Sequence, residues 1–341
     1  MKNYCMFELA ALAALTFASC SSESVEDLGG NQTSQQVAIG FDGYLGRSAV
    51  DTRGTESDIT AIQAAGKGFG VFGNYSTTDG STPTYGKNLF ENQQVTYSST
   101  DSKWTYNPVK YWPTEGHIDF LAYAPYDGEQ VLKNDKELEF MVKSDVTKQI
   151  DLLWDNAANK TKTTEKVKFT FKHALAKIGY SVKSEDNYDK TTITVKSIKL
   201  VGSVDEKTNA FYTKGTIDLS KADNKANDLW TPASDDTKQN FTLLSSNLTL
   251  STTKHEPKDY LFVIPQNFSA PENKLHVVVE YTVKTGETAE LKNKVSKPIT
   301  TNFEQGKAYM INLKIGLTPI EFNAEVSSWP NAESIGDFTW N

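Results

Sequence analysis

The sequence contains very little cysteine, and all of it lies near one end. Its 341 residues include two cysteines, Cys5 and Cys20, both within the first 20 positions. A mature chain beginning at Cys20 would hold a single thiol, which excludes an intrachain disulfide. The same scarcity removes the usual thiolate ligands of structural zinc sites and the nucleophile of thiol enzymes.

Arginine is equally scarce, and no basic block is present. Two of the 35 basic residues are arginines, and the lysines are spread along a chain whose net charge is −8. Proteins that bind nucleic acid concentrate Lys and Arg on one face or in one run. The sequence therefore predicts no nucleic-acid partner.

Motifs for catalysis or cofactor binding are also missing. There is no GxSxG elbow, P-loop or GxGxxG motif. The histidines are too far apart for a local metal motif: His117, His173, His255 and His276. Carboxylates are plentiful, so a glycoside hydrolase is the least supported alternative, with no pair singled out. We expect no enzyme activity, cofactor or metal, with His173 structural and His276 facing solvent.

The N-terminal segment has the features of an export signal. Its apolar stretch, Leu9–Phe17, is too short to span a bilayer, and small residues lead into Cys20. This order resembles the bacterial lipobox, in which the cysteine carries acyl chains such as palmitate and each buried methylene contributes about 0.8 kcal/mol of membrane binding. We expect a signal peptide at 1–19 and a lipidated flexible tether at 20–36, which is polar. Ordinary secretion with a coincidental cysteine is the alternative.

From Val37 onward the dominant hydrophobic period is two, which is typical of β-strands. Val37–Leu45 is the first such segment, and the alternation is cleaner in Val167–Phe171 and Leu275–Val283. Many short strands separated by turn residues predict an all-β chain of two tandem sandwich domains. A polar stretch places the boundary between 37–160 and 161–341. One short helix is expected around His173–Lys177.

Four aromatic residues gather between two prolines and allow two interpretations: Trp104, Tyr106, Tyr111 and Trp112. Exposed on a β-sandwich, they could stack on sugar rings. Packed inward, they would fill the core beside the turns at Pro108 and Pro113. We favour the packing interpretation.

The ordered motifs of residues 37–329 resemble one known family. The motifs are WTYNPVKYWP (104–113), HIDFLAYAP (117–125), IDLLW (150–154), VKFTFKHALAKI (167–178), DYLFVIP (259–265) and GKAY (306–309). Their order and spacing are similar to those of the Bacteroidales fimbrillin family, the Mfa-like and FimA-like subunits of type V pili. The resemblance covers nearly the whole mature chain.

The resemblance implies two transthyretin-like β-sandwich domains and a structural role in a cell-surface fimbria that serves adhesion. It implies export as an outer-membrane lipoprotein and removal of the first strand by an arginine-specific protease. A strand from a neighbouring subunit then fills the vacated groove. The implied partners are other fimbrial subunits, the protease, the outer membrane before processing, and a host or bacterial surface ligand.

The positions of the two arginines favour such processing independently. Arg47 and Arg53 both follow the first predicted strand, in the Gly/Ser/Thr/Asp segment 46–54. A segment of that composition is an exposed, protease-sensitive loop. We expect Arg53 to be cut first, because Thr-Arg before a small residue resembles the processing position of the family, with Arg47 as second choice. The alternative is that arginine is scarce merely because the composition is lysine-rich, and that the positions of the two arginines have no role in processing.

The segment that cleavage would release is apolar on one side. It presents Val37, Ile39, Phe41 and Leu45, and large apolar side chains contribute about 1.5–3 kcal/mol each when buried. The candidate donor is the C-terminal strand with Ile320, Phe322 and Val326, or the tail 330–341; the sequence does not choose between them.

Two questions stay open at the level of the sequence. A fimbrial protein of this kind serves as a stalk, anchor or tip subunit. A stand-alone surface lipoprotein that binds glycans through exposed aromatics is the alternative function.

Overall fold

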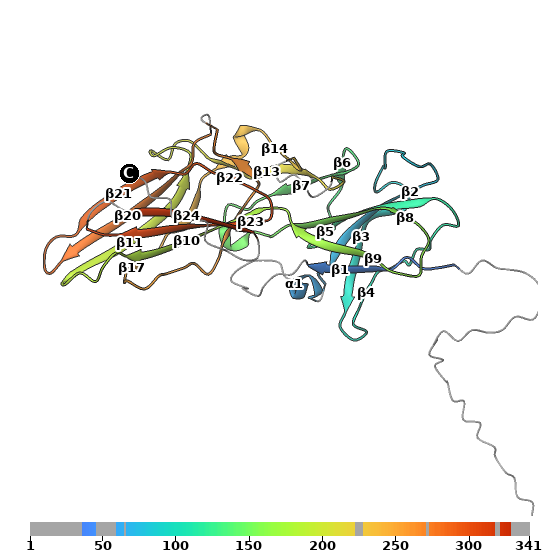
Figure 1. The fold of residues 1–341 in the computed structure, drawn as a ribbon, viewed down its shortest axis with the longest axis horizontal. Helices are drawn as coiled ribbons and strands as arrows, with labels where there is room; N and C mark the ends of the chain where they lie inside the picture. Colours follow the sequence, from blue (N-terminus) through green and yellow to red (C-terminus); the bar gives the residue numbers. More distant parts are fainter. Residues whose placement is uncertain are drawn as a thin grey trace, which may run out of the picture. The chain divides into compact units, whose positions relative to one another are not determined.

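Strands dominate the computed structural model, as predicted (Figure 1). The structure describes residues 36–45, 59–64, 66–221, 228–270 and 273–317, and the backbone of 321–328. Cys20, Arg47, Arg53, Ile320 and the tail 330–341 lie outside the described residues. The all-β class predicted from the period-two pattern is confirmed.

A seven-stranded sheet forms the N-terminal part of the described chain. Its strand order is β1-β9-β8-β5-β2-β3-β4. The bounds are β1 Phe41–Leu45, β2 Phe69–Ser76, β3 Phe90–Ser98, β4 Lys103–Thr105, β5 His117–Ala124, β8 Leu153–Lys160 and β9 Val167–His173. A short helix, α1 Ile59–Gln63, lies between β1 and β2 in the chain and buries Ile62. Every pair is antiparallel except β1 with β9.

The central strand β5 separates two hydrophobic cores. All eight of its residues are buried, and alternate residues serve opposite faces because successive side chains of a strand point to opposite sides. Phe120 and Ala122 join one core, which also holds Ile39 and Phe41. Leu121 joins the other core, which extends through the C-terminal part. The first core is called the aromatic core below.

The remaining strands form five further sheets. Two larger ones, of orders β18-β10-β23-β24 and β16-β11-β20-β21, lie in the C-terminal part, with β17 paired to β11. A sheet of order β14-β13-β7-β6 joins strands from both halves of the sequence, and β12-β15 and β19-β22 are two-stranded. The bounds are β6 Leu132–Lys133, β7 Glu137–Met141, β10 Ala176–Ser184, β11 Thr191–Val201, β12 Phe211–Tyr212, β13 Lys214–Asp218, β14 Trp230–Pro232, β15 Lys238–Gln239, β16 Phe241–Leu244, β17 Leu248–Thr249, β18 Leu261–Val263, β19 Gln266–Asn267, β20 His276–Thr285, β21 Leu291–Pro298, β22 Asn302–Phe303, β23 Lys307–Ile315 and β24 Glu321–Ser328. Two single-turn 3₁₀ helices, at Val146–Lys148 and Asp235–Thr237, complete the described elements. None of the described helices is long and apolar enough to cross a membrane.

The helix predicted around His173–Lys177 is wrong. His173 ends β9 and β10 begins at Ala176, so the segment passes from one sheet to another. Its backbone groups bond to distant partners: the indole N–H of Trp230 donates to the carbonyl of Ala174 at 2.7 Å, and the N–H of Ala174 donates to Leu152 at 2.8 Å. Burial and tertiary hydrogen bonds therefore override the helix propensity of the Ala-Leu-Ala run.

The predicted boundary at residue 160 does not coincide with the end of a sheet. Residues 161–166 connect β8 to β9, and these two strands pair within the seven-stranded sheet. The polar residues read as a linker are a hairpin connection, and β8 runs through to Lys160. The sheets change between β9 and β10 instead. The count of two domains stays a prediction.

Candidate functional site

The candidate site is the groove that holds residues 37–45, including the predicted removable strand. One wall is β9, which pairs with β1 in parallel from Phe41 opposite Val167 to Leu45 opposite Phe171. The ladder begins one residue earlier, where the N–H of Val167 donates to the carbonyl of Gly40 at 2.8 Å. Figure 1 shows β1 running alongside β9. This wall is separated from β1 by more than a hundred residues of sequence.

The second wall is the segment between β4 and β5. The N–H of Ile39 donates to the carbonyl of Lys110, and the N–H of Trp112 donates to the carbonyl of Val37, both at 2.8 Å. The hydroxyl of Tyr106 donates to the carbonyl of Ile39 at 2.7 Å. Residues 37–45 are thus bonded along one side to β9 and, at their start, along the other side to this segment.

The side chains that enter the groove are those expected from the sequence. Ile39 and Phe41 are each only 1% exposed, and Val37 and Leu45 pack partly buried against the aromatic core. The Phe41 ring lies 5.3–5.9 Å, centroid to centroid, from four other rings: Phe90, Tyr106, Phe120 and Phe169. Phe41 is therefore the central anchor of the strand.

A constriction separates the Phe41 and Leu45 positions, and sequence reasoning missed it. Gly43 lies there, and a Cβ added to it would lie 3.0 Å from Cε1 of Phe69 and 3.2 Å from Cε2 of Phe171. Distances of 3.0–3.4 Å are tighter than ordinary van der Waals contact, so even the methyl group of an alanine would require Phe69 or Phe171 to shift by a few tenths of an ångström. A glycine inside an apolar alternation is the signal that could have revealed it.

Polar contacts fix the outer side of the strand. Asp42 forms an ion pair with Lys166 at 2.8 Å, and the Tyr44 hydroxyl donates to Asp42 at 3.3 Å. Tyr44 is about half exposed. Surface pairs of this kind contribute little free energy, so the apolar side chains and the backbone bonds hold the strand.

The strand β9 depends on β1 because its other neighbour holds it at one end only. The β8–β9 ladder consists of two residue pairs, Leu153 with His173 and Trp154 with Lys172. Beyond them, the Asp155 carboxylate accepts a hydrogen bond from the N–H of Thr170 at 2.7 Å. Burial raises the pKa of Asp155, and the Thr170 N–H opposes this rise. Without β1, the first half of β9 would lose its main backbone partner.

The structure places the histidines outside any described metal cluster. His173 is buried and its Nδ1 lies 2.9 Å from the Asp151 carboxylate, which confirms it as a structural histidine. The expectation that His276 faces solvent is wrong: it is partly buried, and burial, reinforced by Lys274, lowers its pKa. In the described ranges, no group of three or more His, Cys, Asp or Glu side chains is placed to hold a metal.

The packing interpretation of the aromatic group is confirmed for both tryptophans. Trp104 is 8% exposed and Trp112 5%. The Trp104 ring packs edge-on against Phe69 at 4.9 Å, so it supports the constriction. Tyr106 is half-buried, and Tyr111 alone of the four is largely exposed, at 46%. These aromatics form a wall of the groove instead of a sugar-binding platform.

The candidate donor strand lies at the edge of a C-terminal sheet. β24 pairs antiparallel with β23 of its own chain, with Phe322 opposite Leu313 and Val326 opposite Tyr309. Its other edge pairs with no strand in the part of the chain that the structure describes. The structure therefore does not bring Phe322 and Val326 together with the groove of the same chain.

Fold and site together define a class: an all-β protein whose aromatic core is completed by a strand preceding a candidate cleavage segment. The chain belongs to the fimbrillin-like family, whose model matches residues 52–329. The recognition made from the ordered motifs is thereby confirmed. No curated protein matches the sequence significantly.

Solved structures share the fold. A fimbrial protein from Bacteroides vulgatus aligns with a TM-score of 0.69 at 22% identity, covering 86% of this chain and 100% of its own. A putative cell adhesion protein from Bacteroides ovatus gives 0.52 at 16% identity, covering 87% and 99%. One from Bacteroides uniformis gives 0.50 at 17% identity, covering 88% and 100%.

Proposed function

We propose that this protein is a structural, non-enzymatic subunit of a cell-surface fimbria. In this proposal, the subunit assembles by strand addition at the groove of residues 37–45. The observation that carries it is the seating of the first strand: it is bonded to two walls and inserts Ile39 and Phe41 into the aromatic core, yet it precedes the rest of the fold. The family and the fimbrial and cell adhesion names of the structural relatives support the same role.

Removal of the first strand would leave an exposed groove that favours binding of a replacement strand. Burial of Ile39 and Phe41 contributes about 1.5–3 kcal/mol each, and their loss exposes apolar surface inside the seven-stranded sheet. It also leaves unpaired N–H and C=O groups on β9, and such an edge readily recruits another strand. A strand from a second subunit restores both kinds of interaction.

The two arginines supply the place for this removal. Arg47 and Arg53 follow β1 directly in the sequence and are the only arginines, so an arginine-specific protease would separate residues 37–45 from an otherwise uncut chain. Before cleavage, a signal peptide at 1–19 and acylation at Cys20 would direct the subunit to the outer membrane and hold it there. Cleavage would release the mature subunit from the lipid-bearing segment.

Strand addition of this kind produces filaments. The donor segment and the acceptor groove are different surfaces of one molecule, so the contact is heterologous and continues from subunit to subunit. Self-copies and accessory subunits are the expected partners, and an adhesion ligand belongs to the assembled fibre. The glycan-binding alternative loses its support because Trp104 and Trp112 are buried.

The proposal is tested by blocking the cleavage. Arg47→Lys with Arg53→Lys keeps the charge but removes both protease sites, so cells making this variant should carry unprocessed, lipidated subunits and few fibres. Purified wild-type protein treated with an arginine-specific protease should form fibres visible by negative-stain electron microscopy. Normal fibres from the double variant, together with a wild-type protein that stays monomeric after trimming, would overturn the proposal.

A further inference from the structure

We propose that the C-terminal part of the molecule carries a separate ligand site, which binds a short neutral oligosaccharide. The site is a hollow of about 590 Å³ that Tyr180 lines, called the Tyr180 hollow below. Binding there requires no strand exchange, so the inference goes beyond the assembly role and can be tested on the monomer. Only the use of this site in adhesion rests on the proposed function.

Distant parts of the chain supply the walls of the Tyr180 hollow. Tyr180 belongs to β10, whereas Thr242 and Leu243 belong to β16, which lies in the other large C-terminal sheet. The 3₁₀ helix at Val146–Lys148 and the segment 255–259 line the remaining sides. The volume falls within the roughly 300–1,000 Å³ that small-molecule sites occupy. The hollow is therefore large enough for a short oligosaccharide.

Backbone hydrogen bonds hold these walls in place. The N–H of Val182 donates to the carbonyl of His255, and the N–H of His255 donates to the carbonyl of Val182, both at 2.9 Å. Just after the 3₁₀ helix, the side-chain carbonyl of Gln149 accepts a hydrogen bond from the N–H of Phe262 at 2.7 Å. A site whose walls are already ordered loses less conformational entropy when a ligand binds.

The hydroxyl of Tyr180 is the observation that points to a ligand. Tyr180 is 2% exposed, yet its hydroxyl has no hydrogen-bond partner in the part of the chain that the structure describes. The hydroxyls of two other buried tyrosines, Tyr123 and Tyr309, each donate to a backbone carbonyl at 2.7 Å. Burial raises the pKa of Tyr180 to about 12, so its hydroxyl stays protonated and can donate. An unbonded buried hydroxyl costs free energy, which a ligand oxygen in the hollow would recover.

The other lining side chains combine apolar faces with hydroxyl groups. Leu243 and Pro257 are apolar, and the His255 ring lies 6.5 Å from the Tyr180 ring, centroid to centroid. Thr242 is exposed and adds a hydroxyl to the rim. A sugar ring matches such a lining, because its C–H face packs on apolar and aromatic side chains while its hydroxyls bond to the polar groups around them.

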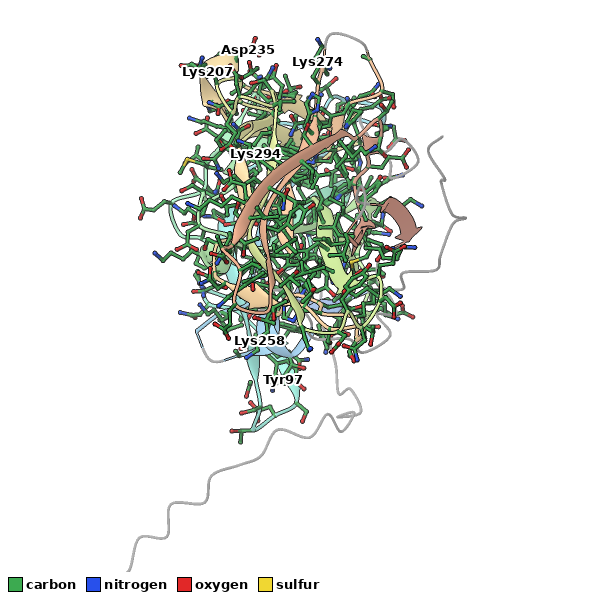
Figure 2. All side chains as sticks on the ribbon, turned by 90° about the vertical axis from the view of Figure 1, so that its left-hand side faces the viewer. Tyr97, Lys207, Asp235, Lys258, Lys274 and Lys294 are labelled. Atoms are coloured by element: carbon green, nitrogen blue, oxygen red, sulfur yellow. The ribbon has the colours of Figure 1, made fainter. Side chains whose placement is uncertain are left out.

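The charges of the Tyr180 hollow favour a neutral ligand over an acidic one. Two lining carboxylates are each paired with a lysine: Asp145 with Lys148 at 3.0 Å and Glu256 with Lys254 at 3.3 Å. The other two charged residues of the lining, Lys258 and Asp259, have opposite signs (Lys258 is labelled in Figure 2). No arginine is among the lining residues. A sialylated sugar would therefore meet no excess of positive charge.

A glycan array tests the class of ligand. The untrimmed chain, purified without acyl groups as the Cys20→Ser variant, is screened against neutral oligosaccharides and their sialylated forms. Neutral oligosaccharides should bind, and calorimetric titration with the strongest of them should give one site per chain. The sialylated form of the same oligosaccharide should bind more weakly. Binding to none of the neutral oligosaccharides, or a preference for the sialylated forms, would overturn the assigned ligand class.

The Tyr180→Phe variant tests the location of the site. It keeps the ring and removes only the hydroxyl, so the midpoint of thermal unfolding should stay unchanged. Its affinity for the neutral oligosaccharide selected on the array should fall about two- to tenfold. Tyr281→Phe is the matched control, because Tyr281 is also buried but does not line the hollow, and its affinity should equal that of the wild type. Equal affinities of Tyr180→Phe and the wild type would overturn the assigned site.

A blocking variant separates this inference from the proposed function. Thr242→Trp places a large side chain at the rim of the Tyr180 hollow and should abolish oligosaccharide binding. Thr249→Trp, at an exposed position of β17 outside the lining, is the control and should bind normally. Both variants should still form fibres after trimming, because neither residue belongs to the groove of residues 37–45. Full binding by Thr242→Trp would overturn the inference and leave the proposed function standing, whereas failure of the trimmed wild type to form fibres would count against the proposed function alone.

Discussion

Two edge strands of this protein differ in almost every property that governs strand pairing. β1 places apolar residues in an aromatic groove and is bonded to a partner on one side and, just before its start, on the other. β21 is the edge of the β16-β11-β20-β21 sheet and is largely exposed. It carries Lys292, Lys294 and Lys297 and ends at Pro298 (Lys294 is labelled in Figure 2).

The difference indicates how the proposed strand exchange would be confined to one edge of the molecule. Charged side chains, especially lysines, and proline protect an edge from unwanted pairing. On β21, Lys294 is held by Glu206 at 2.7 Å and lies 3.6 Å from Glu280. The groove of β1 has no such protection on its inner face and depends on its occupant. Under the proposed function, the edge at β1 is the one where a strand would be replaced, and the charged edge at β21 would resist pairing.

The largest expected effect is at the anchor of β1. Phe41→Ala removes the ring that contacts four other aromatic rings and should destabilise the intact chain by about 3–5 kcal/mol. Denaturant unfolding of the purified protein measures it. Tyr44→Ala, on the exposed side of the same strand, is the control and should change stability by less than about 0.5 kcal/mol. Equal losses for the two variants would show that the groove does not hold this strand.

The next effect is at the constriction. Gly43→Leu should destabilise the intact chain by about 1–3 kcal/mol through overpacking against Phe69 and Phe171. Gly43→Ala should cost less, because it adds a single methyl group. Thermal or denaturant unfolding gives the order of the three proteins. A leucine variant as stable as the wild type would show that the groove widens freely and does not select small residues.

A smaller effect is expected from Asp155, which supports β9. Because burial raises its folded pKa above the unfolded value, the folded state binds the proton more tightly. This contribution to stability is present below the unfolded pKa and is lost as the pH rises through the folded pKa. Asp155→Asn keeps an acceptor for the Thr170 N–H and has no such dependence. Between pH 3 and pH 7, the unfolding free energy of the wild type should fall relative to that of Asp155→Asn as the pH rises. Parallel curves for the two proteins would contradict this expectation.

The smallest effect on stability is expected on β21. Lys292→Thr with Lys297→Thr changes exposed side chains, so the unfolding free energy should shift by less than about 0.5 kcal/mol. The untrimmed double variant should nevertheless self-associate at lower concentration than the wild type, as measured by light scattering. A variant that stays monomeric at every concentration tested would show that the lysines do not protect this edge.

Local patterns in the sequence predicted the occupant of the groove well. The alternation of Val37, Ile39 and Phe41 predicted a strand over Val37–Leu45, and the structure has its C-terminal part, Phe41–Leu45, as β1. Ile39 and Phe41 are each 1% exposed, so their burial is as expected. The same alternation gave Val167–Phe171 as a strand. Periodicity works here because each strand buries one face, and that requirement is local.

The walls of the groove could not be predicted in the same way. That β9 pairs with β1, and that Lys110 and Trp112 bond to the segment before it, depends on contacts between residues far apart in the chain. The boundary predicted at residue 160 falls in the connection between two paired strands, β8 and β9, because a polar hairpin and a polar linker have the same composition. The helix around His173–Lys177 failed because its backbone partners are supplied by distant residues such as Trp230.

The parallel pairing of β1 with β9 also has a consequence for the order of synthesis. β1 is synthesised before its partner β9, which follows more than a hundred residues later in the chain. Pairings between such distant segments form slowly. The second core, which runs through the C-terminal part, contains no residue of β1. The second core can thus form without β1, and β1 is expected to pair only after β9 has been synthesised.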